Sequence, residues 1–275
     1  MARWTPERWR KLRIKTGFSV YYGFFLMFIY GPMFAMFVLS FQGRRGGTSF
    51  PMRGYSLYWW HKLLEPSSVG DMQGAMGRSV ILALMVMVIT ALFATMLAMA
   101  FRKKFFFSNV LFYTILTGLM VPGVLLSLGM AILMRQLGIS PAWYTSGLAV
   151  HVIWALPFSY LVMMAVFNRF DPSLEEAARD MGASEWTVFK EITLPLIIPG
   201  VVAAGLFGFT LSYDEFARMT LLSGAENTLP LDINASMTQR IRPTLFALGT
   251  ASTIFSLLMI SLFLGIYTIL YRRSR

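Results

Sequence analysis

Six long apolar segments constrain the fold of this 275-residue chain more than any other feature of its sequence. A helix needs about 20 apolar residues to cross the hydrocarbon layer of a membrane. The segments cover approximately residues 17–41, 80–101, 108–134, 145–167, 196–213 and 244–271. Prolines occur inside several of them, which neighbouring helices in a membrane can accommodate. The sequence therefore predicts an all-α membrane protein with six transmembrane helices.

The composition agrees with a chain that is surrounded by lipid. Charged residues make up 13% of the chain, against about 25% in an ordinary soluble domain. The formal net charge of +11 would suit a nucleic-acid-binding protein. However, the lysines and arginines cluster at the ends of the apolar segments, as they do in membrane proteins. No zinc-finger spacing or RNA-binding aromatic motif occurs in the sequence, so we expect no nucleic-acid partner.

Several kinds of catalytic site are excluded by what the sequence lacks. There is no cysteine, which excludes thiol catalysis, disulfides and cysteine–metal clusters. The two histidines, His61 and His151, are far apart and form no HExxH motif. The phosphate-binding pattern GxxxxGKS/T is absent as well. We therefore expect no catalytic residue, metal or cofactor in this chain, and an energy source that lies in a partner or in an ion gradient.

The distribution of basic residues predicts how the chain is oriented. An even number of spans puts both termini on one side of the membrane. If that side is the inside, the inner segments carry fifteen lysines and arginines, six of them in the N-terminal tail 1–16, and the outer segments carry nine. The positive-inside rule then predicts cytoplasmic termini. We expect segment 17–41 to be a retained helix, because the apolar core of a signal peptide has only about 7–15 residues.

The predicted outer loop 42–78 is too long to be a simple connection. It contains four closely spaced aromatic residues, Tyr55, Tyr58, Trp59 and Trp60. Trp and Tyr collect where a membrane meets water. The simpler interpretation of this loop is therefore an interfacial segment, and the alternative is an aromatic cluster that binds a ligand.

The predicted inner loop 168–195 has the pattern of a short exposed helix. Ser173 and Glu176 have the spacing of a capping box, and Gly182 is a plausible end of the helix. Ala178 and Gly182 are four residues apart, which predicts one face of small residues that would permit close approach of another surface. An amphipathic stretch, 186–192, follows. These features fit a docking helix and an ordinary interfacial helix equally well.

This loop resembles the signature of ABC importer permeases, E-A-A-x3-G-x9-I-x-L-P. All of its positions and spacings are matched, by Glu176, Ala177, Ala178, Gly182, Ile192, Leu194 and Pro195. The resemblance implies a type I ABC importer permease fold, with one permease domain over residues 17–275 and a family-like core over about 80–271. It also implies that the loop contains the coupling helix, which docks on a cytoplasmic ATPase.

The resemblance further implies the partners of the chain. They are a second homologous permease subunit, a cytoplasmic ABC ATPase dimer that binds ATP and Mg, and a periplasmic solute-binding protein. The chain would then lie among lipids in the bacterial inner (plasma) membrane as a multi-pass protein.

A second, weaker resemblance concerns the solute. Residues 209–216 and 229–231 are similar to the spermidine/putrescine-type branch of these permeases, which implies a polyamine or a similar small solute. Asp214 and Glu215 lie near the predicted outer end of the fifth span. Either they form a solvated helix end, or they line the translocation path or gate, attracting a cation or pairing with Arg218 four residues on.

Two other classes of membrane protein compete with an ABC importer. An ion-gradient-driven secondary transporter or channel usually carries ionisable residues near the middle of its spans. Here His151 is the main such residue, and a hydrogen bond to a neighbouring helix explains it more simply than a proton relay. An intramembrane enzyme would need a nucleophile–base pair or a metal site, which the sequence does not show.

Overall fold

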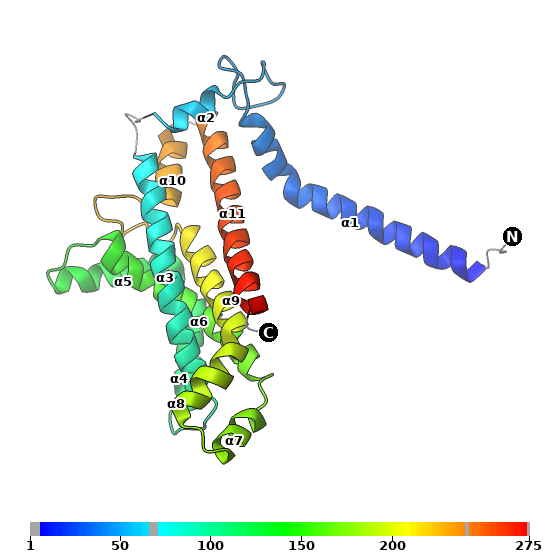
Figure 1. Cartoon of the computed structure of the whole chain (residues 1–275). Coiled ribbons are helices and arrows are strands. Elements are labelled where there is room, and N and C mark those ends of the chain that lie inside the picture. Colours follow the sequence, from blue (N-terminus) through cyan, green and yellow to red (C-terminus); the bar gives the residue numbers. More distant parts are fainter. Residues whose placement is uncertain (1–5, 66–70, 240–241, 274–275) are drawn as a thin grey trace. The chain divides into compact units, whose positions relative to one another are not determined.

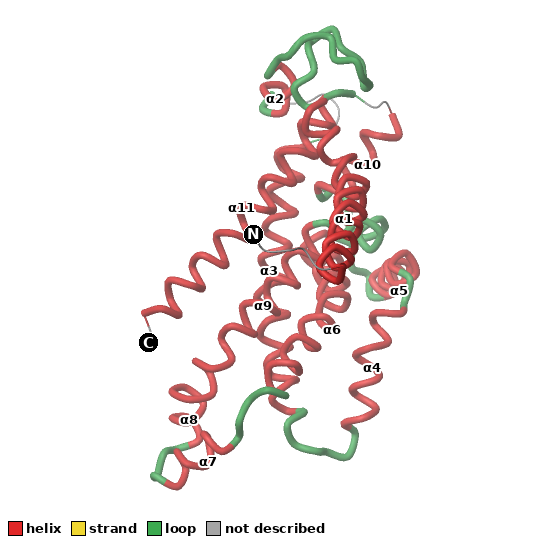
Figure 2. Tube along the Cα trace, turned by 90° about the vertical axis from the view of Figure 1, so that its right-hand side faces the viewer, coloured by secondary structure: helices red, strands yellow, loops and turns green. Residues whose placement is uncertain are grey.

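The computed structural model describes residues 6–65, 71–239 and 242–273, and its regular structure is helical (Figures 1 and 2). Within those ranges the only β-type pairing is an isolated bridge between Gln42 and Tyr55. The prediction of an all-α protein is confirmed. Among the described residues, five helical stretches are long and apolar enough to cross a membrane: Arg13–Leu39, Met72–Ala100, Trp143–Phe167, Glu185–Tyr213 and Thr244–Gly265.

The elements follow one another in a simple order. The first half of the chain contains α1 (Pro6–Leu39), α2 (Tyr58–Leu63), α3 (Met72–Ala100), α4 (Ser108–Met120) and α5 (Gly123–Gln136). A π-helical turn, η1 (Trp143–Gly147), leads into α6 (Leu148–Phe167), which is followed by α7 (Ser173–Asp180) and α8 (Glu185–Val188). A second π-helical turn, η2 (Phe189–Thr193), leads into α9 (Leu194–Tyr213), and α10 (Leu229–Gln239) and α11 (Thr244–Arg273) complete the chain.

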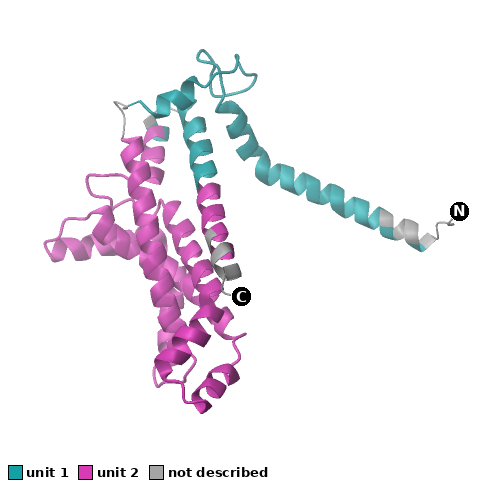
Figure 3. Ribbon diagram, in the orientation of Figure 1, with its two compact units in different colours: residues 1–66, 237–255 teal, residues 67–236, 256–275 magenta. Residues whose placement is uncertain are grey.

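The chain forms two compact units (Figure 3). The first comprises Met1–Pro66 and Met237–Phe255, and the second comprises Ser67–Ser236 and Ser256–Arg275. In the first unit, the side-chain amide of Gln42 organises the loop after α1. Its Oε1 accepts a hydrogen bond from the Arg53 backbone at 2.8 Å, and its Nε2 donates to the Gly47 carbonyl at 3.2 Å. In the same unit, the Phe41 and Trp60 rings pack with centroids 5.7 Å apart.

The core of the second unit is a bundle of α3, α6 and α9, which all contact one another (Figure 2). Small residues allow these helices to approach closely, as is usual in membranes. A Cβ atom on Gly205 of α9 would lie 3.3 Å from the Met87 side chain of α3, and one on Gly208 would collide with the Thr90 hydroxyl. Glycine at position 208 therefore leaves room for the Thr90 hydroxyl in the contact of α3 with α9, while a side chain at position 205 would need only a small shift of Met87.

The third apolar segment differs from its prediction. Residues 108–134 were expected to form one span, but α4 and α5 meet at an angle of 107°. Val121 at the break is extended, with ψ of 123°, because a residue before proline avoids the helical conformation. After Pro122, α5 restarts with hydrogen bonds from Leu125 and Leu126 to the Pro122 carbonyl. The predicted total of six spans holds only if this bent pair counts as one.

The fifth helical stretch begins earlier than predicted. The sequence suggested a span from residue 196, but α8, η2 and α9 are continuous from Glu185 to Tyr213. The stretch continues through Pro195, which lies just after the π-helical turn η2. A proline has no N–H to donate, so the stretch lacks one backbone hydrogen bond at this point.

Candidate functional site

The short helix α7 begins differently from the predicted capping box. Its N-cap is Pro172, which makes no side-chain capping bond. Instead, the Asp171 carboxylate accepts a hydrogen bond from the Ser173 backbone N–H at 3.0 Å. The predicted cap by Ser173, with Glu176 reaching back, is therefore wrong. Asp171, which precedes Pro172, satisfies the backbone N–H at the start of α7. Glu176 is exposed.

Gly182 ends α7 as predicted. Its φ of 86° lies in the left-handed region, one residue beyond the C-cap Met181. The Gly182 N–H donates to the Arg179 carbonyl at 2.8 Å, and the Ala183 N–H donates to the Ala178 carbonyl at 3.0 Å. These two bonds form a Schellman motif. Because Gly182 lies outside the helix, the predicted helical face shared by Ala178 and Gly182 is wrong.

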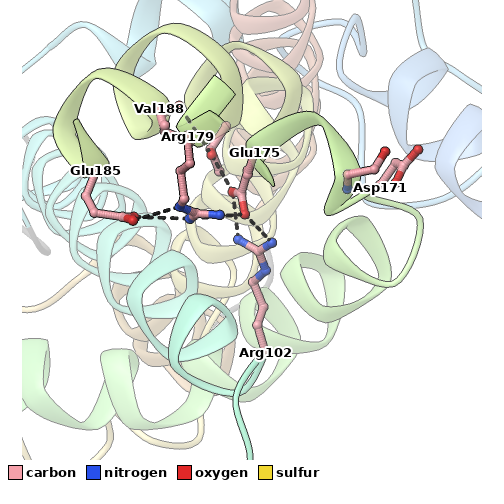
Figure 4. A network of polar contacts seen from close by, with 8 residues as sticks. Arg102, Asp171, Glu175, Arg179, Glu185 and Val188 are labelled. Carbon is pink, nitrogen blue, oxygen red and sulfur yellow. Dashed lines mark hydrogen bonds and ion pairs between the residues drawn. The ribbon is translucent and has the colours of Figure 1, made fainter. Parts of the chain in front are cut away.

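The residue that anchors α7 is Glu175, which the sequence analysis did not select. Its side chain is only 8% exposed and forms a two-pronged ion pair with Arg102, just after α3, at 2.9 and 2.7 Å (Figure 4). The Thr193 hydroxyl of η2 donates to the same carboxylate at 2.6 Å. The hydrogen bonds from Arg102 hold the pKa of the Glu175 carboxyl below its usual value, against the opposing effect of burial.

Arg179 extends this network from α7 to α8. Its guanidinium donates to both carboxylate oxygens of Glu185, at 2.7 and 3.1 Å, and lies 3.9 Å from a Glu175 oxygen. The Arg102 guanidinium also lies over the rings of Phe167 and Phe170, 5.3 and 4.9 Å from their centroids. We call Arg102, Glu175, Arg179, Glu185 and Thr193 the anchor cluster. It ties α7 and α8 to the end of α3 and to η2.

A cavity of about 1130 Å³ opens beside the anchor cluster. Its lining includes Arg102, Glu175, Glu176, Arg179, Val188 and Phe189. The cavity is therefore lined by charged side chains of α7 and α8, including Glu185, together with the apolar side chains of Val188 and Phe189. Because α7 touches the bundle mainly through Glu175, the rest of its surface remains available to another molecule.

The seven residues of the predicted signature divide into two groups. Glu176, Ala177 and Gly182 are exposed on and just after α7, where Ala178 is half-buried. Ile192, Leu194 and Pro195 lie in the helical stretch that continues into α9, the first two half-buried and the third exposed. Next to the first group lie two exposed apolar side chains, Met181 at 89% and Trp186 at 70%. Exposed apolar side chains on a charged loop are typical of a surface that binds a partner.

The pairing predicted for Asp214 is wrong. Arg218 binds Glu215 instead, through its backbone N–H at 2.9 Å and its guanidinium at 2.8 Å. The reason is that α9 ends at Tyr213, so helical four-residue spacing does not apply beyond it. Asp214 is exposed, whereas the Glu215 and Arg218 side chains are only 10% and 9% exposed. The Arg218 guanidinium lies 3.5 Å from the centroid of the Trp154 ring of α6.

His151 forms a hydrogen bond to a neighbouring helix, which is the simpler of its two predicted roles. Its side chain is buried in α6, and its Nδ1 lies 2.8 Å from the Ser212 hydroxyl of α9. This hydrogen bond joins two neighbouring helices of the bundle. The position of His151 is therefore explained by helix packing, without a chain of proton-relay groups.

Comparison with known proteins identifies similar sequences over most of the chain. The family described as binding-protein-dependent transport system inner membrane component matches residues 91–275. Over 239 residues, the chain is 30% identical to the spermidine/putrescine transport system permease protein PotC of Escherichia coli strain K12, covering 85% of this chain and 87% of that protein. It is also 30% identical over 251 residues to the putrescine transport system permease protein PotI of the same strain, covering 88% and 84%.

Two solved structures have a similar fold. One is described as a bacterial ABC transporter involved in the import of the acidic polysaccharide alginate, with a TM-score of 0.73 over 95% of this chain and 98% of that chain. The other, the inward-facing MetNI methionine ABC transporter, has a TM-score of 0.54 over 74% of this chain and 98% of that one. The sequence identities are 15% and 17%, so these structures support the type I permease fold and carry no information about the solute.

Proposed function

This chain belongs to the family of binding-protein-dependent transport system inner membrane components, and we propose that it couples a solute pathway to cytoplasmic ATPase subunits through loop 168–195. It is a multi-pass permease subunit of an ABC importer in the inner membrane. What the proposal adds is the mechanical role of the loop, the partners and the solute.

The observation that carries the coupling role is the anchor cluster. Glu175 faces the bundle and is held by Arg102 and Thr193, while Glu176 and Ala177 on the same helix are exposed. A bidentate pair of an arginine and a carboxylate has a specific geometry, so it opposes movement of α7 relative to the end of α3. A force applied to the exposed face of α7 would therefore be transmitted to the ends of α3, α6 and α9 rather than being lost in a flexible loop.

The ATPase partner would supply the chemical energy. The chain has no GxxxxGKS/T sequence, so ATP and Mg would be bound by the cytoplasmic ABC ATPase dimer. In the proposed cycle, the pathway opens to the periplasmic solute-binding protein when ATP is bound and opens to the cytoplasm after hydrolysis. A second homologous permease subunit would complete the pathway within a single permease domain over residues 17–275, in contact with membrane lipid.

We propose a polyamine or a similar small organic cation as the solute. The names of the relatives PotC and PotI, each 30% identical over most of the chain, support a polyamine. Asp214, which is exposed just beyond α9, is a candidate for attracting a cation to the pathway. Glu215 is a poorer candidate in its present state, because Arg218 already neutralises it.

The assignment predicts solute-dependent ATP hydrolysis. The complete complex, purified through a tag on this chain and placed in liposomes, should retain an ATPase subunit. Its ATPase rate should rise several-fold when the periplasmic binding protein loaded with putrescine or spermidine is added. The unloaded binding protein is the control. Purification without any ATPase subunit would exclude an ABC importer complex and favour the ion-gradient alternative, whereas stimulation by other solutes alone would exclude only the polyamine.

The orientation can be tested with single cysteines, because the natural chain has none. Ser49→Cys lies in the loop after α1 and Ser173→Cys lies at the start of α7, and both positions are exposed. The positive-inside rule predicts that a membrane-impermeant thiol reagent labels position 49 in whole cells and labels position 173 only after the cells are opened. The unmodified chain should not be labelled. Labelling of position 173 in whole cells would reverse the proposed topology.

A further inference from the structure

Arg218 lies in an unusual place for a charged residue in this protein. It belongs to the non-helical segment 214–228 between α9 and α10, and it is buried against the helical bundle. Its neighbours in the segment, Met219 and Leu222, belong to the core cluster formed with Leu82 of α3 and Val150 of α6. Irregular backbone among membrane helices occurs where it is buried in protein or lines a cavity, and ionisable residues there generally have a function.

The groups around the Arg218 guanidinium are those that proteins use to bind organic cations. The Trp154 ring covers one face at 3.5 Å, and the Glu215 carboxylate accepts a hydrogen bond at 2.8 Å. An aromatic face attracts a cation through its quadrupole, and a carboxylate adds a charge-assisted hydrogen bond. Here the cation that Trp154 and Glu215 hold is the guanidinium of Arg218, a residue of the same chain.

The surrounding backbone leaves room for this side chain. Gly123 starts α5 immediately after the 107° break, and a Cβ atom there would lie 3.0 Å from Arg218 Cγ and 3.2 Å from Nη1. The Ser127 hydroxyl of α5 donates to the backbone carbonyl of Arg218 and thus fixes the main chain. The break between α4 and α5 therefore faces segment 214–228 at this point. Solute sites of many transporters lie where a membrane helix is interrupted.

The guanidinium of Arg218 does not use all of its hydrogen-bond donors. Within the described part of the chain, its buried Nε has no hydrogen-bond partner. The nearby buried His151 also has an Nε2 without a partner there. A buried donor left unpaired destabilises the folded protein. The Trp154 ring and the Glu215 carboxylate therefore define the site that the guanidinium occupies, and one of its donors remains unpaired. Replacing the guanidinium by another cation would break few hydrogen bonds.

We propose that Trp154 and Glu215 form a binding site for an organic ammonium or guanidinium cation, which Arg218 occupies in this structure as a tethered ligand. A cationic solute enters the site by displacing the Arg218 head group, and Arg218 returns when the solute leaves. The exchange of one cation for another keeps the Glu215 carboxylate paired with a positive charge throughout. This inference rests on the proposed function in one respect, namely that the transported solute is a cation.

The test is to remove the tethered cation and supply a free one. The complex containing the full-length chain with Arg218→Ala should unfold at a lower temperature than the wild-type complex, because Glu215 loses its partner. Methylguanidinium or putrescine should raise that temperature, with an apparent affinity at least tenfold higher than for the wild-type complex, whose site is filled. Arg218→Gln, which keeps most of the side-chain length without the charge, should show the same gain.

Two controls make the outcome specific. The double variant Arg218→Ala with Glu215→Gln should lose the cation-dependent stabilisation, and Trp154→Leu in the Arg218→Ala background should weaken it. If the Arg218 variants do not assemble, methylguanidinium present during purification should restore assembly. The inference is overturned if the cations stabilise the single and double variants equally, or if they neither stabilise nor restore the single variants. These stability measurements do not depend on transport. If polyamines fail to stimulate the wild-type ATPase, the solute assignment is refuted, but stabilisation of the Arg218 variants by cations would still support the cation site.

Discussion

Replacing Glu175 by alanine should abolish the stimulation of ATP hydrolysis by the loaded binding protein, while the chain still inserts into the membrane. The variant removes the acceptor that Arg102 and Thr193 share. Breaking a buried ion pair by removing one partner costs about 3–5 kcal/mol. That range is an upper bound here, because the Arg102 side chain is 25% exposed and can recover some hydration. Even the lower part of the range would release α7 from the bundle.

The expected loss in stimulation is at least tenfold, since a tenfold change corresponds to about 1.4 kcal/mol. The matched control for the anchoring of α7, as distinct from its contact with the ATPase, is Glu176→Ala, the same substitution one residue along α7, which removes an exposed carboxylate without a bond to Arg102. Hydrogen exchange of the α7 amides should become faster in the Glu175 variant and remain unchanged in the control. If the Glu175 variant keeps normal ATPase stimulation although its α7 amides exchange hydrogen faster, coupling through the loop does not require the anchor cluster.

A double replacement separates the charge from the packing. Arg102→Met combined with Glu175→Leu removes both charges and fills the space with apolar groups. Buried ion pairs can often be exchanged for apolar residues of similar volume without loss of stability. This double variant should therefore keep more coupling than either Glu175→Ala or Arg102→Ala alone. A double variant worse than both single variants would mean that the charges themselves are needed, for example by the ATPase partner.

Gly182→Leu should also uncouple the permease, by at least tenfold in ATPase stimulation. With φ of 86°, the backbone of Gly182 is in the left-handed region, which costs other residues about 1–2 kcal/mol. A Cβ atom at this position would meet nothing within 4 Å among the described residues, so the energetic penalty inside the subunit comes from the backbone conformation. The strain would unwind the last turn of α7, which closes through the bonds to Ala178 and Arg179.

A series of substitutions at position 182 tests this reason. Asparagine tolerates the left-handed conformation better than other residues with a side chain, so Gly182→Asn should retain most of the coupling and Gly182→Ala should lose more despite its smaller volume. ATPase stimulation in liposomes at matched subunit stoichiometry ranks the three variants. A ranking that follows side-chain volume instead, with asparagine worse than alanine, would mean that Gly182 is needed for close contact with the ATPase surface.

The sequence by itself determined the features of this protein that depend on neighbouring residues. Five of the six long apolar segments correspond to helical stretches long enough to cross a membrane, because a span is defined by its own length and hydropathy. Gly182 was predicted to end α7, because a left-handed position after a helix selects glycine from local backbone sterics alone. The spacing from Glu176 to Pro195 was enough to suggest the permease family, to which the chain does belong.

Only the tertiary structure decided which polar side chains are paired. The sequence does not show which of the neighbouring residues Glu175 and Glu176 faces the bundle, yet the first is buried against an arginine 73 positions away and the second is exposed. Arg218 pairs with Glu215 only three positions away, but its contact with the Trp154 ring of α6 depends on how segment 214–228 packs against the bundle. Helix ends follow from local sterics and hydrogen bonding, whereas the partner of a buried charge depends on how segments distant in the sequence pack together.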